Sequence, residues 1–136
     1  MRELTSHKIE GKGAGHDTSG IIVCDEPGQG GACHKYAVVK NVVRASDGSG
    51  ECGYMLEDIL ARVEFQNGPI QEFGVNGVQQ EHLLAIVEDR LASFQAGPFA
   101  NAYNAEALAH VQAAMAALHR RTTDRIARQV EGFNKA

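Results

Sequence analysis

The sequence has no tryptophan and only three prolines among its 136 residues. The scarcity of proline, together with 43% hydrophobic residues, excludes a proline-rich or disordered chain and supports a packed core. Its apolar runs are all shorter than the roughly 18 residues that a membrane-spanning helix needs, so we expect no contact with a membrane. The first residues, MRELTSHKIEGKG, also lack the apolar stretch of a secretion signal. The protein is therefore expected to stay in the cytoplasm in which it is made.

Positive charge is also scarce, because 13 Lys and Arg residues face 17 Asp and Glu residues and leave a net charge of −4. This balance argues against a general binder of DNA or RNA. The cysteines Cys24, Cys33 and Cys52 are odd in number and fit no zinc spacing, so we interpret them as packing residues and predict no metal. The sequence has neither an HExxH motif nor a nucleophile elbow. We therefore predict no catalytic residue, no cofactor and no enzyme.

The first half of the chain alternates β-branched runs with glycine-rich turns. Runs typical of strands cover residues 6–9, 20–24, 34–43, 59–66 and 70–73. The Asn-Gly-Pro sequence at 67–69 has the composition of a hairpin turn before the last of them. We predict four or five antiparallel strands in a β-domain over residues 1–75. The glycine-rich segment 25–34 lacks the Gly-Lys-Ser/Thr ending of a phosphate loop, which favours a wide β-connection over a ligand loop.

Residues 76–136 have the pattern of a helical hairpin, two helices joined by a tight Ala-Gly-Pro link at 96–98. The apolar stripes are Leu84, Val87, Leu91 and Phe94 in the first helix, and Leu108, Val111, Met115, Leu118, Thr122, Ile126 and Val130 in the second. Their spacing of threes and fours places each stripe on one helix face. We expect the second helix to begin near Asn101 or Asn104 and to continue through Glu131 to a stop at Gly132.

The predicted second helix is long for so small a protein. A helix of about 30 residues would measure roughly 45 Å. One partner helix in a small monomer cannot cover that length, so the pattern predicts association with other chains. The predicted fold class is α+β, an N-terminal antiparallel β-sheet followed by a long C-terminal helical hairpin, assembling as a homo-oligomer.

Arginines gather in the last third of this helix. Arg121, Arg125 and Arg128 are four and three residues apart, so one helix face carries three guanidinium groups that repel one another. Two interpretations are open. The arginines form a solvated face and pair with acids of a neighbouring chain, or they form an anion site in which planar guanidinium groups bind phosphate oxygens.

Several motifs resemble one family. They are DEPGQGGACHKY at 25–36, FQNGPI at 65–70, NGVQQEHLLAIV at 76–87, FQAGPF at 94–99 and RTTDRIARQVEG at 121–132. Over most of residues 20–132 the chain resembles the phage-encoded Thoeris anti-defence sponges, whose helical hairpin is shared with phage anti-CBASS sponges. The resemblance implies a protein of the host cytoplasm that sequesters a glycocyclic isomer of ADP-ribose, made by host TIR-domain enzymes, and does not cleave it. It also implies a homohexamer.

The resemblance further implies a ligand site. Phe94 matches the family's aromatic residue that packs on the ligand, and Asn104 matches its hairpin amide. Arg121 and Arg125 match its pair of phosphate-contacting arginines. Because Phe94 and Asn104 flank the bend, roughly 25–30 Å along one helix from the arginines, we predict a pocket that closes only between chains. Without the resemblance, Phe94 is interpreted equally well as a core residue of its helix.

Three alternatives to this function remain. The same hairpin would serve a sponge for the cyclic di- and trinucleotides of CBASS immunity. An enzyme that degrades the signal is a second alternative, and a structural phage protein whose hairpin only oligomerises is a third. The partner that we predict is a small cyclic ADP-ribose isomer, and neither a nucleic-acid polymer nor a membrane.

Overall fold

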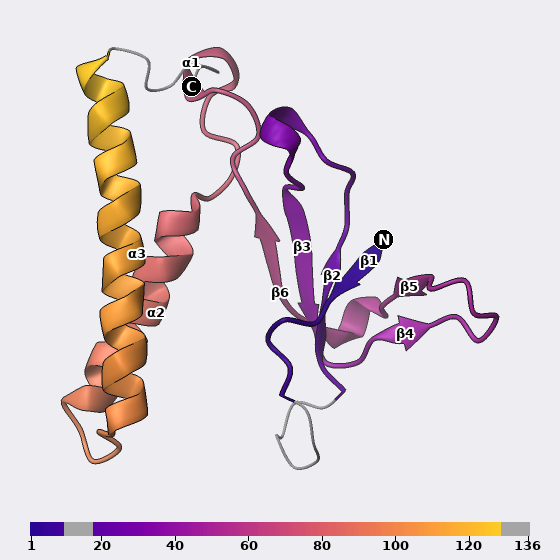
Figure 1. The fold of residues 1–136 in the computed structure, drawn as a ribbon. Coiled ribbons are helices and arrows are strands. Elements are labelled where there is room, and N and C mark those ends of the chain that lie inside the picture. The colour runs from indigo at the N-terminus through magenta and orange to yellow at the C-terminus, as the bar shows by residue number, and fades with distance from the viewer. Residues whose placement is uncertain (10–17, 129–136) are drawn as a thin grey trace. The chain divides into compact units, whose positions relative to one another are not determined.

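The computed structural model describes residues 1–9 and 18–128, and the chain divides into two compact units, Met1–Asn67 and Gly68–Ala136 (Figure 1). The strands lie in the first unit and the long helices in the second, which confirms the predicted α+β class and its order. The division into a β-domain over residues 1–75 and a ligand-binding, oligomerising hairpin over residues 76–136 remains a prediction. Within the described ranges, no helix has both the length and the apolar character that a membrane crossing requires.

The main sheet of the first unit has four antiparallel strands in the order β1-β2-β3-β6. The strands are β1 (Arg2–Leu4), β2 (Gly20–Val23), β3 (Lys35–Val39) and β6 (Ile59–Glu64). The central pair, β2 and β3, places Ile22 opposite Ala37. Ile22, Ala37 and Val39 are fully buried and form the core cluster, since β-branched and small residues pack well on a pleated surface.

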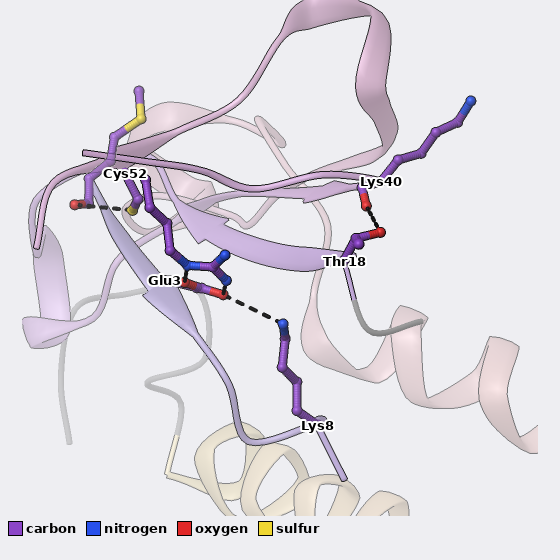
Figure 2. Close-up of polar contacts among 7 residues, drawn as sticks. Glu3, Lys8, Thr18, Lys40 and Cys52 are labelled. Atoms are coloured by element: carbon purple, nitrogen blue, oxygen red, sulfur yellow. Dashed lines mark hydrogen bonds and ion pairs between the residues drawn. The ribbon is translucent and has the colours of Figure 1, made fainter. Parts of the chain in front are cut away.

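A second, two-stranded sheet pairs β4 (Val43–Arg44) with β5 (Cys52–Gly53). The Arg44 guanidinium donates to both carboxylate oxygens of Glu3 in β1, at 2.7 and 3.0 Å. Figure 2 shows the Glu3 carboxylate with Lys8, whose Nζ lies 3.9 Å away. It also shows the Thr18 hydroxyl, which donates to the Lys40 carbonyl at 3.0 Å. These contacts attach the outer segments to the main sheet.

Two strand predictions are wrong. Residues 6–9 are not a strand; the chain turns there, with the Lys8 N–H donating to the Thr5 carbonyl at 2.9 Å. Residues 70–73 are the short helix α1 (Ile70–Phe73) and not the second arm of a β-hairpin. Pro69 has no N–H for a strand ladder, and its carbonyl instead accepts from the Phe73 N–H at 2.9 Å. Gly74, with a φ of 69°, ends this turn of helix.

The two long helices of the second unit, α2 (Gln80–Gln95) and α3 (Ala102–Ala127), lie side by side (Figure 1). A reciprocal cap begins α2, in which the Gln79 N–H donates to His82 Nδ1 at 2.9 Å and the Gln79 side chain accepts from the His82 N–H. Asn101 is the N-cap of α3, because its side chain accepts from the Asn104 N–H at 2.8 Å. The hairpin prediction is therefore confirmed, and Asn101 rather than Asn104 is the cap.

No residue that the structure describes in α2 or α3 is buried. The half-buried positions of α3 are Asn104, Leu108, Val111, Met115, Leu118, Thr122 and Arg125. This stripe agrees with the predicted one as far as Thr122, after which Arg125 replaces Ile126, whose side chain is 60% exposed. The change follows from the geometry, because 125 continues the alternation of threes and fours. The predicted positions Val130, Glu131 and Gly132 lie outside the described residues.

Candidate functional site

Arg121 lies in the last third of α3, beside the start of α2. Its Nη2 atom is 3.9 Å from Oε2 of Glu81, in the first turn of α2. The Arg121 side chain is 48% exposed, and that of Glu81 is 17% exposed. The pair therefore joins the two helices at this end of the hairpin and leaves the guanidinium accessible to other groups.

The acids of this chain change the interpretation of the arginine cluster. Arg121 is accompanied by Glu81, and Arg128 by Asp124, one turn back in its own helix at 2.8 Å. Acids of a neighbouring chain are thus not needed to offset these two charges. Arg125 is half-buried and lies on the same stripe of α3 as Leu118 and Thr122. Together, Arg121 and Arg125 hold two guanidinium groups one turn apart at the arginine end of the hairpin.

A cavity of about 270 Å³ lies beside this end of the hairpin; its described lining includes Glu81, the partner of Arg121, but neither Arg121 nor Arg125. It is lined by Gln79, Glu81, His119, Thr122 and Thr123. The hydroxyls, the amide and the imidazole all offer hydrogen-bond donors, and Glu81 is the one carboxylate among these described lining residues. Ligand pockets typically measure about 300–1,000 Å³, so this cavity suits one part of a nucleotide rather than the whole of it. Donors beside a guanidinium suit a phosphate or a ribose.

Phe94 lies at the other end of α2, near the bend. The Arg90 guanidinium carbon is 5.0 Å from the centroid of the Phe94 ring, within the range of a cation–π contact. The ring of Phe99 meets Phe94 edge to face, with the centroids 6.4 Å apart. Phe94 is half-buried and Phe99 is 70% exposed. An exposed group of aromatic rings with a guanidinium is the kind of surface on which a base stacks.

Asn104 lies on the first turn of α3, close to the bend in the chain. Its backbone N–H is used by the Asn101 cap, and its side-chain amide takes no part in that bond. The side chain is half-buried on the same stripe as Arg125. Its amide offers both a donor and an acceptor to a base edge or a hydroxyl.

The four predicted residues thus form two groups at opposite ends of the hairpin. Arg121 and Arg125 lie at the end where α2 begins, and Phe94 and Asn104 flank the bend. At 1.5 Å per residue, Phe94 is about 20 Å along α2 from Glu81, and Asn104 about 25 Å along α3 from Arg121. One chain does not bring the two groups into a single pocket.

Sequence reasoning missed Glu81 and Arg90. The pair of Glu81 with Arg121 joins two helices, and it depends on the register of the hairpin, which the sequence alone does not fix. Arg90 stands four residues before Phe94, the spacing at which side chains meet on one helix face. The Arg90 contact therefore had a local signal in the sequence, whereas the Glu81 contact did not.

The two ends of the glycine-rich segment 25–34 are held together by hydrogen bonds of the Asp25 carboxylate. The Asp25 carboxylate accepts from the backbone N–H groups of His34 at 3.0 Å and Lys35 at 3.1 Å. Desolvation raises the pKa of Asp25, but the N–H donors of Lys35 and His34 outweigh it and lower that pKa below its ordinary value. This closure is typical of a structural connection. Cys24, Cys33 and Cys52 are free thiols, and the described residues hold no cluster of three metal-ligating side chains.

The second half of the chain is similar to known phage proteins. A sequence model of the hairpin domain of Acb2/Tad1 matches residues 57–123. "Thoeris anti-defense 1" of Bacillus phage SBSphiJ7 is 45% identical over 76 residues, which are 56% of this chain and 54% of that protein. The chain thus spans about half the length of this relative. The matched domain contains Glu81, Phe94, Asn104 and Arg121, and it ends just before Arg125.

Proposed function

Because residues 57–123 make this chain a member of the phage anti-defence family with the Acb2/Tad1 hairpin domain, we propose that it counters Thoeris immunity as a sponge. The sponge binds a glycocyclic ADP-ribose signal made by TIR enzymes in the host cytoplasm and does not cleave it. Effectors that depend on this signal then stay inactive. The name of the relative from Bacillus phage SBSphiJ7 supports the anti-Thoeris role.

The spacing of two arginines at the arginine end of the hairpin is the observation that supports a pyrophosphate-containing ligand. Arg121 and Arg125 present two guanidinium groups one helical turn apart, and a pyrophosphate presents two adjacent phosphates. The cavity with His119, Thr122 and Thr123 offers donors to the ribose next to those phosphates. Phe94 packs on the adenine, and Asn104 bonds to a base edge or a hydroxyl.

The proposed pocket takes its two halves from two chains. Within one chain, the arginines lie about 20–30 Å along the helices from Phe94 and Asn104. A neighbouring hairpin running in the opposite sense would place its bend beside the arginines. The absence of buried residues in the described parts of α2 and α3 supports such packing, because two helices alone cover little of each other. We propose residues 76–136 as the part that binds and oligomerises, in a homohexamer.

Release of the ligand by heat tests this proposal. The protein is incubated with the product of a TIR enzyme, separated from free ligand and heated, and the supernatant is analysed by mass spectrometry. A sponge depletes the signal before heating and releases it intact afterwards. Altered products would identify an enzyme instead, and a signal that is never depleted would overturn the proposed function.

A second candidate function is a sponge for the cyclic oligonucleotides of CBASS immunity. The matched domain carries the names of both Acb2 and Tad1, which favours this candidate over unrelated ones. Calorimetric titration of cyclic di- and trinucleotides beside the ADP-ribose isomer separates the two. Tight binding of the cyclic oligonucleotides alone would establish the second candidate.

A further inference from the structure

Glu81 places an acid inside the region where we propose that phosphate binds. Its carboxylate is the more buried partner of the pair with Arg121, 17% exposed against 48%. The 3.9 Å between Arg121 Nη2 and Glu81 Oε2 exceeds the roughly 2.7–2.9 Å of a charge-assisted hydrogen bond. Arg121 and Glu81 therefore form an ion pair without a short hydrogen bond, so the N–H donors of this guanidinium can turn toward a phosphate that lies near the carboxylate.

The cavity at the arginine end gives this carboxylate a second role. Gln79, His119, Thr122 and Thr123 line the cavity with groups that donate hydrogen bonds, whereas the carboxylate of Glu81 accepts them. A phosphate entering here is attracted by Arg121 and the donors and repelled by Glu81. A hydroxyl group entering here forms favourable hydrogen bonds with both kinds of group, because it donates to Glu81 and accepts from the other lining residues.

We propose that Glu81 is a specificity-determining residue, which rejects simple polyanions and admits ligands that carry sugar hydroxyls beside their phosphates. This inference rests on the proposed function, since it concerns the same arginines. An acidic side chain that accepts from ribose hydroxyls next to a pyrophosphate is a known solution in dinucleotide sites. A site without such a residue would fill with inorganic pyrophosphate and polyphosphate, which also present adjacent phosphates to Arg121 but carry no sugar hydroxyl.

The alternative to a role in specificity is a purely structural role for Glu81. Glu81 lies in the first turn of α2, where a negative charge stabilises the helix dipole, and it joins α2 to α3. Such a role affects the stability of the hairpin. It does not predict tighter binding of an anion when the charge is removed.

The experiment uses Glu81→Gln, which keeps the shape of the side chain and removes its charge. The matched control is Asp124→Asn in α3. It removes the carboxylate paired with Arg128 and changes the net charge by the same amount as Glu81→Gln. The probe is inorganic pyrophosphate, titrated calorimetrically at low salt. We expect Glu81→Gln to bind it on the order of tenfold more tightly than the wild type, and Asp124→Asn to behave as the wild type. The double variant Glu81→Gln/Arg121→Ala should lose the gain.

An unchanged or weaker affinity of Glu81→Gln for pyrophosphate would overturn the inference, as would a lack of binding at millimolar pyrophosphate. Glu81→Ala, which removes the carboxylate altogether, serves as the second variant if the first unfolds. The two proposals fail separately. A wild type that ignores the TIR product, with a Glu81→Gln variant that gains pyrophosphate, refutes the sponge alone. A wild type that binds the TIR product, with unchanged pyrophosphate affinity in Glu81→Gln, refutes the role of Glu81 alone.

Discussion

At the scale of single residues, charge decides what each end of the hairpin can bind. Arg121 is half exposed and loosely paired, so its guanidinium can turn toward a phosphate at little cost. Each hydrogen bond to a charged group is worth roughly 1.5–3 kcal/mol, and an arginine fork makes two of them. In the proposed site, two arginines one turn apart would therefore supply a large share of the affinity that a sponge needs.

Arg121→Ala and Arg125→Ala should each abolish sequestration and leave the fold intact. We expect the affinity for the TIR product to fall about a hundredfold or more, in line with roughly 3 kcal/mol for a lost fork. Calorimetry measures the affinity, and circular dichroism verifies the helix content. Arg120→Ala is the matched control, because Arg120 is exposed on the same turn and is not a predicted contact. Wild-type affinity in both site variants would remove the assignment.

Asp25 makes the stability of the β-unit depend on pH. Its pKa lies below the ordinary 3.8 in the folded protein, since the N–H donors of Lys35 and His34 outweigh the effect of desolvation. A lowered folded pKa contributes stability above the ordinary pKa, and that stability is lost as the pH falls through the folded value. Asp25→Asn should therefore lower the melting temperature by a few degrees at about pH 7 and by less at about pH 3. Equal shifts at both pH values in thermal melts would contradict this.

At the scale of elements, local signals were predictable and distant pairings were not. The stripe of α3 and its Asn101 cap depend on residues three and four apart, and the Ala-Gly-Pro composition indicated the bend. The cap of α2, formed by Gln79 and His82, was not predicted, and Val87 of the predicted α2 stripe is exposed. The first strand pairs Arg2 with Val23, and nothing within residues 1–9 announces that partner. The Asn-Gly-Pro sequence at 67–69 favours a hairpin by composition, yet Pro69 cannot donate to a ladder and begins α1 instead.

Two asparagines at the start of α3 have different roles in our account: Asn101 is structural, and Asn104 is proposed to bind the ligand. Asn101 caps the helix, so Asn101→Ala should destabilise the hairpin by about 1 kcal/mol. Asn104→Ala leaves that cap in place, because the bond uses the backbone N–H of residue 104. We expect thermal melts to shift for the first variant only. Calorimetry with the TIR product should show weaker binding for Asn104→Ala, and a reversed pattern would exchange the two roles.

At the scale of the whole molecule, the described residues hold their buried core in the sheet and none of it in the hairpin. Ile86 and Val87 are among the large apolar side chains that the helices leave exposed. A hairpin that binds a ligand tightly needs a rigid frame, and the second hairpin of the proposed assembly would supply one by covering these helices. In the proposed assembly, binding and association are linked, because each proposed pocket takes groups from two chains.

Mixed assemblies test this link directly. Phe94→Ala removes the aromatic half of the proposed pocket, and Arg121→Ala removes the phosphate half, so neither variant alone should bind the TIR product. In an assembly of both, the Phe94→Ala chain still supplies Arg121 and the Arg121→Ala chain still supplies Phe94. A pocket formed from these two residues is intact. Random pairing in a two-fold symmetric arrangement restores about a quarter of the sites. Co-expression of the two variants followed by titration should therefore recover binding at about that stoichiometry. A mixture as inactive as its parts would mean that each pocket lies within a single chain.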